Sequence, residues 1–174
     1  MKKILALVLV LALTLGCTAA LADTYGLGVQ TALSSSASAT DEKDGTAEAD
    51  VTICALVVDD EGKIVSCIFD VVQATVGFDA AGQITSDLMA EVLTKQEKGA
   101  DYGMVVASAI GKEWNEQADA LAAYCVGKTL DEAIAGIAEE NGHATGADVV
   151  SGCTMGVTDL VKALEKAYAA ATAE

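Results

Sequence analysis

The sequence predicts a single α+β domain, in which an antiparallel β meander from the N-terminal half packs against helices from the C-terminal half. Three strand-like runs lie between residues 24 and 78; the first alternates apolar residues with small or polar ones, and the other two flank a turn. From residue 112 onward the apolar residues recur at helical spacing instead. After a predicted leader, residues 23–174 have the length of one ordinary domain with a real core.

Residues 1–22 have the pattern of a secretory signal peptide. Lys2 and Lys3 form a basic start, Ile4–Leu15 is apolar apart from one threonine, and Ala20-Leu21-Ala22 matches a cleavage site. The apolar run is short for a membrane anchor helix. Lipidation of Cys17, which follows Gly16, is an alternative. We expect the chain to be attached to a membrane only if Cys17 is lipidated. We therefore expect an exported protein, extracellular or in the cell envelope.

The remaining chain is strongly acidic. It has 26 acidic residues, eight lysines and no arginine, which gives a net charge of −18. Such a surface repels nucleic acid and anionic lipid, so neither is expected as a partner.

The predicted meander begins with a half-exposed strand at Tyr25–Thr31. Two longer strands, Asp50–Val58 and Lys63–Thr75, flank a turn at Asp59–Gly62. In these two strands apolar residues fall on both faces, so we expect cover on both, by helices or by helices and a loop layer. One face would hold Val51, Ile53, Val57, Ile64 and Ile68, and the other Cys54, Leu56, Val65, Cys67 and Phe69.

Four helices are predicted after the sheet. The first includes Leu88–Leu93 and ends before Gly99, and the second spans Lys112–Val126 and stops at Gly127. Its buried stripe is Trp114, Ala118, Leu121, Ala122 and Cys125. The third is capped by Thr129 and Glu132 and ends near Ala138, with Leu130, Ile134 and Ile137 facing inward. The last has Val157, Leu160, Val161, Leu164 and Tyr168 on one face.

The turn Ser151-Gly152-Cys153-Thr154 is predicted to start the last helix after a short strand at Asp148. Hydroxyl oxygens at a helix start accept the unpaired amides of the first turn. Those amides and the helix dipole also form a site for a phosphate. An ordinary capped turn without a ligand is the alternative interpretation.

This stretch resembles the C-terminal motif of the FMN-binding domain family, found in exported flavoproteins and in the C subunits of sodium-pumping NADH:quinone reductase. The family pattern is Asp, two variable residues, Ser or Thr, Gly, Ala, Thr, and then a helix. Asp148, Ser151, Gly152 and Thr154 match it, whereas Cys153 stands where the family usually has Ala. A second hydroxyl residue is often found where this chain has Gly156. The hairpin around residues 59–64 also resembles the family's hairpin.

The resemblance implies FMN joined through its phosphate to the Thr154 hydroxyl by a separate flavin transferase. Asp148, Ser151, Gly152 and Cys153 would complete the site. The implied task is electron transfer with an unknown redox partner in the cell envelope, rather than turnover of a substrate. Tyr102 is a candidate to stack on the flavin ring or, alternatively, a packed residue of its loop. A cofactor-free binding or structural module with the same fold is the competing interpretation.

Cysteine and histidine side chains suggest further chemistry. Cys54 and Cys67 lie on the two arms of one hairpin, and the loop length decides whether they can form a disulfide. A disulfide-stabilised envelope protein is therefore a third interpretation. Cys153 is either a small buried residue or a redox thiol stabilised at a helix start. The single histidine, His143, is expected at the surface, and the sequence shows no evident partner for it. The sequence has no motif for a catalytic triad, a zinc site or a dinucleotide fingerprint.

Overall fold

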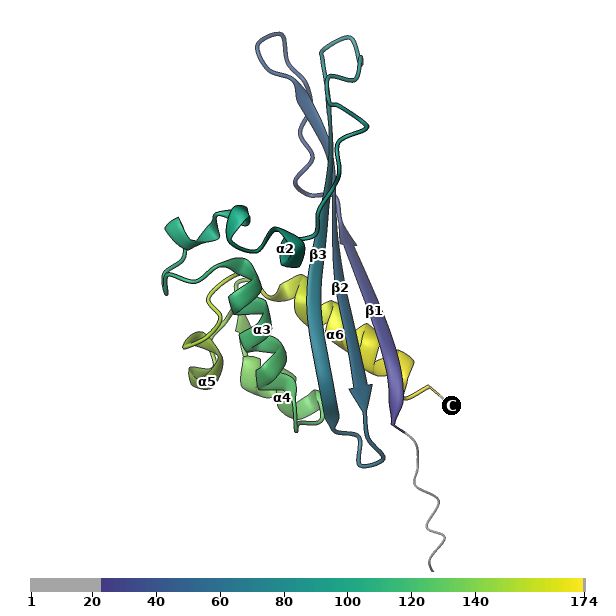
Figure 1. Ribbon diagram of the computed structural model, residues 1–174, viewed down its shortest axis with the longest axis vertical. Coiled ribbons are helices and arrows are strands. Elements are labelled where there is room, and N and C mark those ends of the chain that lie inside the picture. The colour runs from purple at the N-terminus through teal and green to yellow at the C-terminus, as the bar shows by residue number, and fades with distance from the viewer. Residues whose placement is uncertain (1–22, 174) are drawn as a thin grey trace, which may run out of the picture.

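The α+β architecture is confirmed by a computed structural model, which describes residues 23–173. The predicted leader and Cys17 lie outside the described residues. The sheet is antiparallel in the order β1-β2-β3, with β1 at Thr24–Ala32, β2 at Gly45–Val58 and β3 at Ile64–Phe78 (Figure 1). A short second sheet pairs β4, Glu139–Glu140, with β5, His143–Ala144.

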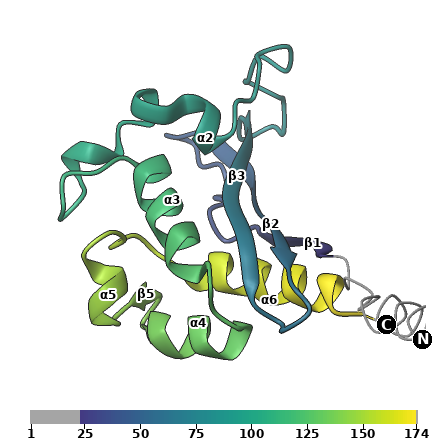
Figure 2. The ribbon, with the colours of Figure 1, turned by 60° about the horizontal axis from the view of Figure 1, so that its bottom comes forward.

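The helices follow the sheet in sequence and gather on one side of it (Figures 1 and 2). The two longest are α3 and α6; α6 packs on β1 and β2, and α3 packs on β3. The helices are α2 (Lys95–Lys98), α3 (Trp114–Cys125), α4 (Leu130–Ile137), α5 (Ala147–Val150) and α6 (Thr158–Ala171), with 3-10 turns η1 (Gly99–Tyr102) and η2 (Met104–Val106).

Two glycines let α6 lie directly on the backbone of β1. A Cβ at Gly26 or Gly28 would overlap the carbonyl oxygen of Ala167 or Ala163, respectively. Ala163, Ala167 and Ala171 of α6 are buried on this side of the helix. The Gly-x-Gly pattern in β1 is therefore a close strand–helix contact, and the small residues on both elements are what allow it.

The core lies between the sheet and the helices, and one β-bulge corrects the predicted faces. Val57 pairs with Ser66 and Val58 with Ile64, which leaves Val65 as an extra residue in β3. Ile64 is therefore buried and Val65 exposed, the reverse of the simple alternation. The buried sheet residues are Cys54, Leu56, Val58, Ile64, Cys67, Phe69 and Val71.

The bulge also decides the geometry of the hairpin cysteines. Cys54 pairs with Phe69 and Cys67 with Leu56, so the two thiols are diagonal neighbours on the buried face. Their sulfur atoms are 3.8 Å apart and both are free. The two cysteines are thus neither directly opposite each other nor on different faces.

The helix predictions are confirmed in part. The stripe of α3 is buried throughout, and Gly127 follows the helix with a φ of +81°. Thr129 and Glu132 form the predicted capping box of α4. The prediction at Leu88–Leu93 is wrong: this segment has no helix and its large side chains are exposed, while the one-turn α2 forms directly after it.

Residues 23–173 do not provide the second predicted layer of cover. Helices cover one face of the sheet, whereas Tyr25, Leu27, Val29 and Ile68 on the other face are exposed. Among residues 23–173, no helix combines the length and the apolar character needed to cross a bilayer.

Candidate functional site

The turn before α6 is organised by the buried side chain of Gln117 in α3, which is 0% exposed. Its Oε1 accepts the backbone N–H groups of Thr154, at 2.8 Å, and Met155, at 3.2 Å. Its Nε2 donates to Ser108 Oγ and to the Lys112 carbonyl oxygen, both at 3.0 Å. One amide group thus joins α3, the loop before it and the turn that holds Thr154.

This arrangement corrects the predicted helix start. The segment at Asp148 forms the one-turn helix α5 instead of a strand, and α6 begins only at Thr158. No side chain caps α6, whose N-cap residue is Val157. The amides of Thr154 and Met155 therefore bind Gln117, and they do not form an open phosphate site at a helix end.

Thr154 forms part of the wall of a cavity of about 500 Å³. The ammonium group of Lys95 lies over two aromatic rings of this cavity, 4.8 Å from the ring centre of Tyr102 and 5.4 Å from that of Trp114. At these distances the cation is attracted to the faces of the rings. The cavity thus offers aromatic surface, one positive charge and one threonine hydroxyl.

The short helix α2 holds Lys95 in place. Its capping box is closed by Thr94 and Glu97. Gln96 then fixes it to β3: its backbone N–H donates to Asp70 Oδ1 and its Nε2 to the Phe69 carbonyl oxygen, each at 3.1 Å. These bonds place the lysine beside the sheet and above the cavity.

The carboxylate of Glu113 fixes the loop wall of the same cavity. It accepts the backbone N–H groups of Met104, at 2.7 Å, and Val105, at 3.1 Å. It also caps α3 together with Glu116. Only 8% of Glu113 is exposed, so two bonds to an ionised acceptor hold the segment that follows Tyr102.

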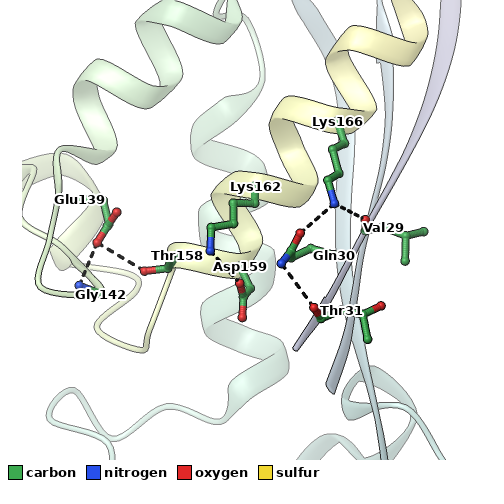
Figure 3. Close-up of polar contacts among 9 residues, drawn as sticks. All are labelled: Val29, Gln30, Thr31, Glu139, Gly142, Thr158, Asp159, Lys162 and Lys166. Carbon is green, nitrogen blue, oxygen red and sulfur yellow. Dashed lines mark hydrogen bonds and ion pairs between the residues drawn. The ribbon is translucent and has the colours of Figure 1, made fainter. Parts of the chain in front are cut away.

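His143 is exposed, as expected, and its ring has a hydrogen-bond partner that the sequence did not reveal. Its Nδ1 is 3.1 Å from the carbonyl oxygen of Thr154, which can only accept, so Nδ1 carries the proton. The hairpin of His143 is tied to the start of α6 by Glu139, which accepts bonds from the Gly142 amide and the Thr158 hydroxyl (Figure 3). A second cavity of about 430 Å³ adjoins the first and shares Lys95, Trp114, His143 and Gly156 with it.

Of the five residues of the predicted site, only Thr154 lines the cavity. Asp148 and Ser151 are exposed on α5 and the following turn, where the Ser151 hydroxyl donates to the Asp148 carbonyl oxygen at 3.3 Å. Gly152 packs on α3, since a Cβ there would lie 2.9 Å from the Ala120 methyl group. Cys153 is fully buried in the core.

The predicted activation of Cys153 is therefore wrong. Its thiol lies in the core instead of at an open helix end, and burial raises its pKa above the ordinary value. A raised pKa keeps the thiol protonated and makes it a poor nucleophile. The structure supports the other interpretation, in which Cys153 is a small buried residue of the turn.

Sequence reasoning missed Lys95, Trp114, Gln117 and His143 as residues around Thr154. Gln117 carried a usable signal, because it lies three residues after Trp114 on the apolar stripe of the predicted helix. A polar residue on a buried stripe needs hydrogen-bond partners, and these are what define the turn.

Comparison with known proteins gives no relative: no family model, no curated protein and no solved structure matches the chain. Within residues 23–173, no group of three or more His, Cys, Asp or Glu side chains is placed to hold a metal ion.

Proposed function

We propose that this chain is an exported electron carrier, with FMN joined through its phosphate to the hydroxyl of Thr154. The observation that carries this proposal is the position of that hydroxyl in the wall of a cavity of about 500 Å³. This volume lies within the range of small-molecule sites. The cavity's aromatic residues and Lys95 provide a setting for a planar, phosphorylated cofactor.

The residues fit such a group in chemical type. Tyr102 offers partly exposed ring surface for stacking, Trp114 forms a nearly buried part of the wall, and Lys95 offers positive charge to a phosphate. The Thr154 hydroxyl donates one bond, to Gln117 at 3.3 Å, which is long for a hydroxyl donor. Modification of the hydroxyl would therefore remove only this weak hydrogen bond, since the backbone N–H of Thr154 still bonds Gln117.

A bound flavin supplies the redox chemistry, and the protein supplies binding, orientation and electrostatics. Covalent attachment suits an exported protein, because a dissociated cofactor would be lost outside the cell. The partners of this proposal are a flavin transferase and a redox protein in the cell envelope. The transferase would break the pyrophosphate bond of FAD, join the flavin phosphate to the Thr154 oxygen, and release AMP and the hydroxyl proton. The chain itself would carry electrons and turn over no substrate.

A cofactor-free exported module is the second candidate. It is favoured by the engagement of the Thr154 and Met155 amides with Gln117, which leaves neither amide to a phosphate. The two departures from the family pattern, Cys153 and Gly156, also favour the cofactor-free module. The disulfide-stabilised interpretation has less support, since Cys54, Cys67, Cys125 and Cys153 are all free.

Two variants coexpressed with an exported flavin transferase test the site. We expect Thr154→Ala to lose flavin absorption that survives denaturation, while its unfolding transition stays close to that of the parent chain. Thr158→Ala is the matched control, because it removes a hydroxyl four residues away that bonds Glu139. Flavin retained by Thr154→Ala would refute the site. Absence of flavin from the parent chain would favour the cofactor-free module.

A further inference from the structure

The face of the sheet opposite the helices is an open apolar surface, which we call the open face. Its side chains alternate with the buried ones along all three strands. Leu27, Ala55 and Ile68 form one cross-strand row at its centre. Its apolar members are Tyr25, Leu27, Val29, Val51, Ile53, Ala55, Val57, Ile68 and Val72.

Several large apolar side chains of the open face are strongly exposed. Tyr25 is 78% exposed, Leu27 61% and Ile68 62%. These three side chains and Val57 also line a groove of about 390 Å³. Large apolar patches on a folded chain mark sites of interaction, and a sheet that is apolar on both sides needs two layers of cover. Residues 23–173 provide only one of them.

Charge indicates which partner suits the open face. Between Tyr25 and Val72 its only ionisable side chain besides the tyrosine is Asp70, which already accepts the backbone N–H groups of Val71 and Gln96. The predicted mature chain carries a net charge of −18, so most of its surface repels a second copy. The open face is where two copies can meet with few carboxylates, since Asp70 is the only one that each copy contributes there.

The area is also adequate. The nine side chains leave on the order of 600 Å² of apolar surface exposed on each copy. This area is at the upper end of the range for the largest apolar patch of a monomeric protein. Two copies would bury about 1,200 Å² in total, which exceeds the roughly 1,000 Å² expected of a specific interface. A two-fold axis brings the same patch of both copies together, and an apolar patch is complementary to itself.

We propose that the open face is a homodimer interface, in which two copies pack sheet against sheet. The pair would form a four-layer molecule, with helices outside and two sheets about 10 Å apart inside. This proposal does not depend on flavin attachment, because Thr154 lies on the helical side of the sheet, in the turn before α6.

Pairing through the free edge of β1 is a less suitable way to form a dimer. Lys166 of α6 reaches this edge, where its ammonium group bonds the Val29 carbonyl oxygen at 2.9 Å and Gln30 Oε1 at 2.7 Å (Figure 3). A lysine on an edge strand opposes the addition of another strand. The apolar face therefore offers the better contact.

Analytical ultracentrifugation of the purified mature chain, over a wide concentration range, tests the interface. We expect a dimer. Leu27→Lys and Ile68→Lys should each weaken self-association by on the order of a hundredfold or more, because an unpaired charge would be buried between the sheets. Lysine makes the chain less acidic, so general repulsion cannot cause this loss. Val106→Lys, an exposed apolar position in η2, is the matched control and should remain dimeric.

We expect each variant to fold, because the replaced side chains are exposed. Circular dichroism and urea unfolding would verify this. A parent chain that is monomeric at every concentration would overturn the proposal. A dimer that persists in both open-face variants would do so as well, since it would assign self-association to another surface. Binding of a monomeric parent chain to neutral phosphatidylcholine vesicles would assign the open face to lipid instead.

Discussion

The side-chain oxygen of Gln117 lies 2.8 Å from the backbone nitrogen of Thr154, and this bond connects the first turn of α3 to the turn before α6. Both groups lie next to the cavity that Thr154 lines. The position of the threonine hydroxyl therefore depends on a buried amide that is 37 residues away in the sequence.

Replacement of this amide should destabilise the fold. Gln117→Met keeps a similar volume but removes the acceptor of two backbone N–H groups and the donor to Ser108 and Lys112. We expect a loss of about 2–3 kcal/mol in the free energy of unfolding, since buried donors are left unsatisfied. Urea unfolding measures it. Gln83→Met, an exposed control, should change little, and equal stability of both variants would contradict the role of Gln117.

Addition of one methyl group to β1 should push α6 away from the strand and lower the free energy of unfolding. In Gly28→Ala the new Cβ would overlap the Ala163 carbonyl oxygen, so α6 must shift. We expect a loss of about 1–3 kcal/mol, as in other overpacked cores. Gly156→Ala is the matched control, because the nearest atom to its Cβ is 3.7 Å away. Thermal unfolding compares the two, and an unchanged midpoint for Gly28→Ala would show that the contact is looser than described.

The buried thiol of Cys125 should make the fold sensitive to alkali. Its hydrogen bond with Cys67 and its burial raise its pKa well above the ordinary value of 9.0. In the unfolded chain the thiol ionises near that ordinary value, while in the folded chain it keeps its proton. The stabilisation is thus complete below about pH 9 and is lost as the pH rises above it.

Cys125→Ala isolates this contribution. The free energy of unfolding should fall less steeply in the variant than in the parent chain between about pH 8 and pH 10, because one thiol no longer ionises on unfolding. Urea titrations at several pH values measure the two slopes. The tyrosines and lysines titrate in both chains and largely cancel in the comparison. Identical slopes would contradict a raised pKa for this thiol.

Glu113 should control the order of the loop that forms one wall of the cavity. Glu113→Ala removes the acceptor for the Met104 and Val105 amides and one cap of α3, at an expected cost of about 2 kcal/mol. Hydrogen exchange at those two amides should become faster. Glu91→Ala, which removes an exposed carboxylate, should leave both rates unchanged. Unaltered protection in Glu113→Ala would show that other contacts hold the loop.

Local patterns predicted the elements that are set by nearby residues. Thr129 and Glu132 lie three positions apart and cap the same helix in the structure, and the apolar stripe of α3 is buried as its spacing predicts. The strands and their turn were also readable. Each of these features depends on side-chain periodicity or on a cap within one turn, and both are visible in a single sequence.

Features that depend on distant contacts were not readable. The bulge at Val65 depends on the pairing of Val57 with Ser66, and it reverses the faces expected for Ile64 and Val65. The turn at Thr154 is shaped by Gln117, and the lysine over the aromatic rings comes from a one-turn helix after residue 93. The motif residues located the threonine of the cavity, but only tertiary packing placed Lys95 and His143 beside it.

The intact mass of the mature chain, after coexpression with an exported flavin transferase, tests the central claim most directly. Attachment to Thr154 predicts a gain equal to one FMN less water, with flavin absorption that survives denaturation and maps to the peptide containing Thr154. An unmodified mass, with the same transferase active on a control flavoprotein, would contradict the claim and leave the cofactor-free module as the function of this fold.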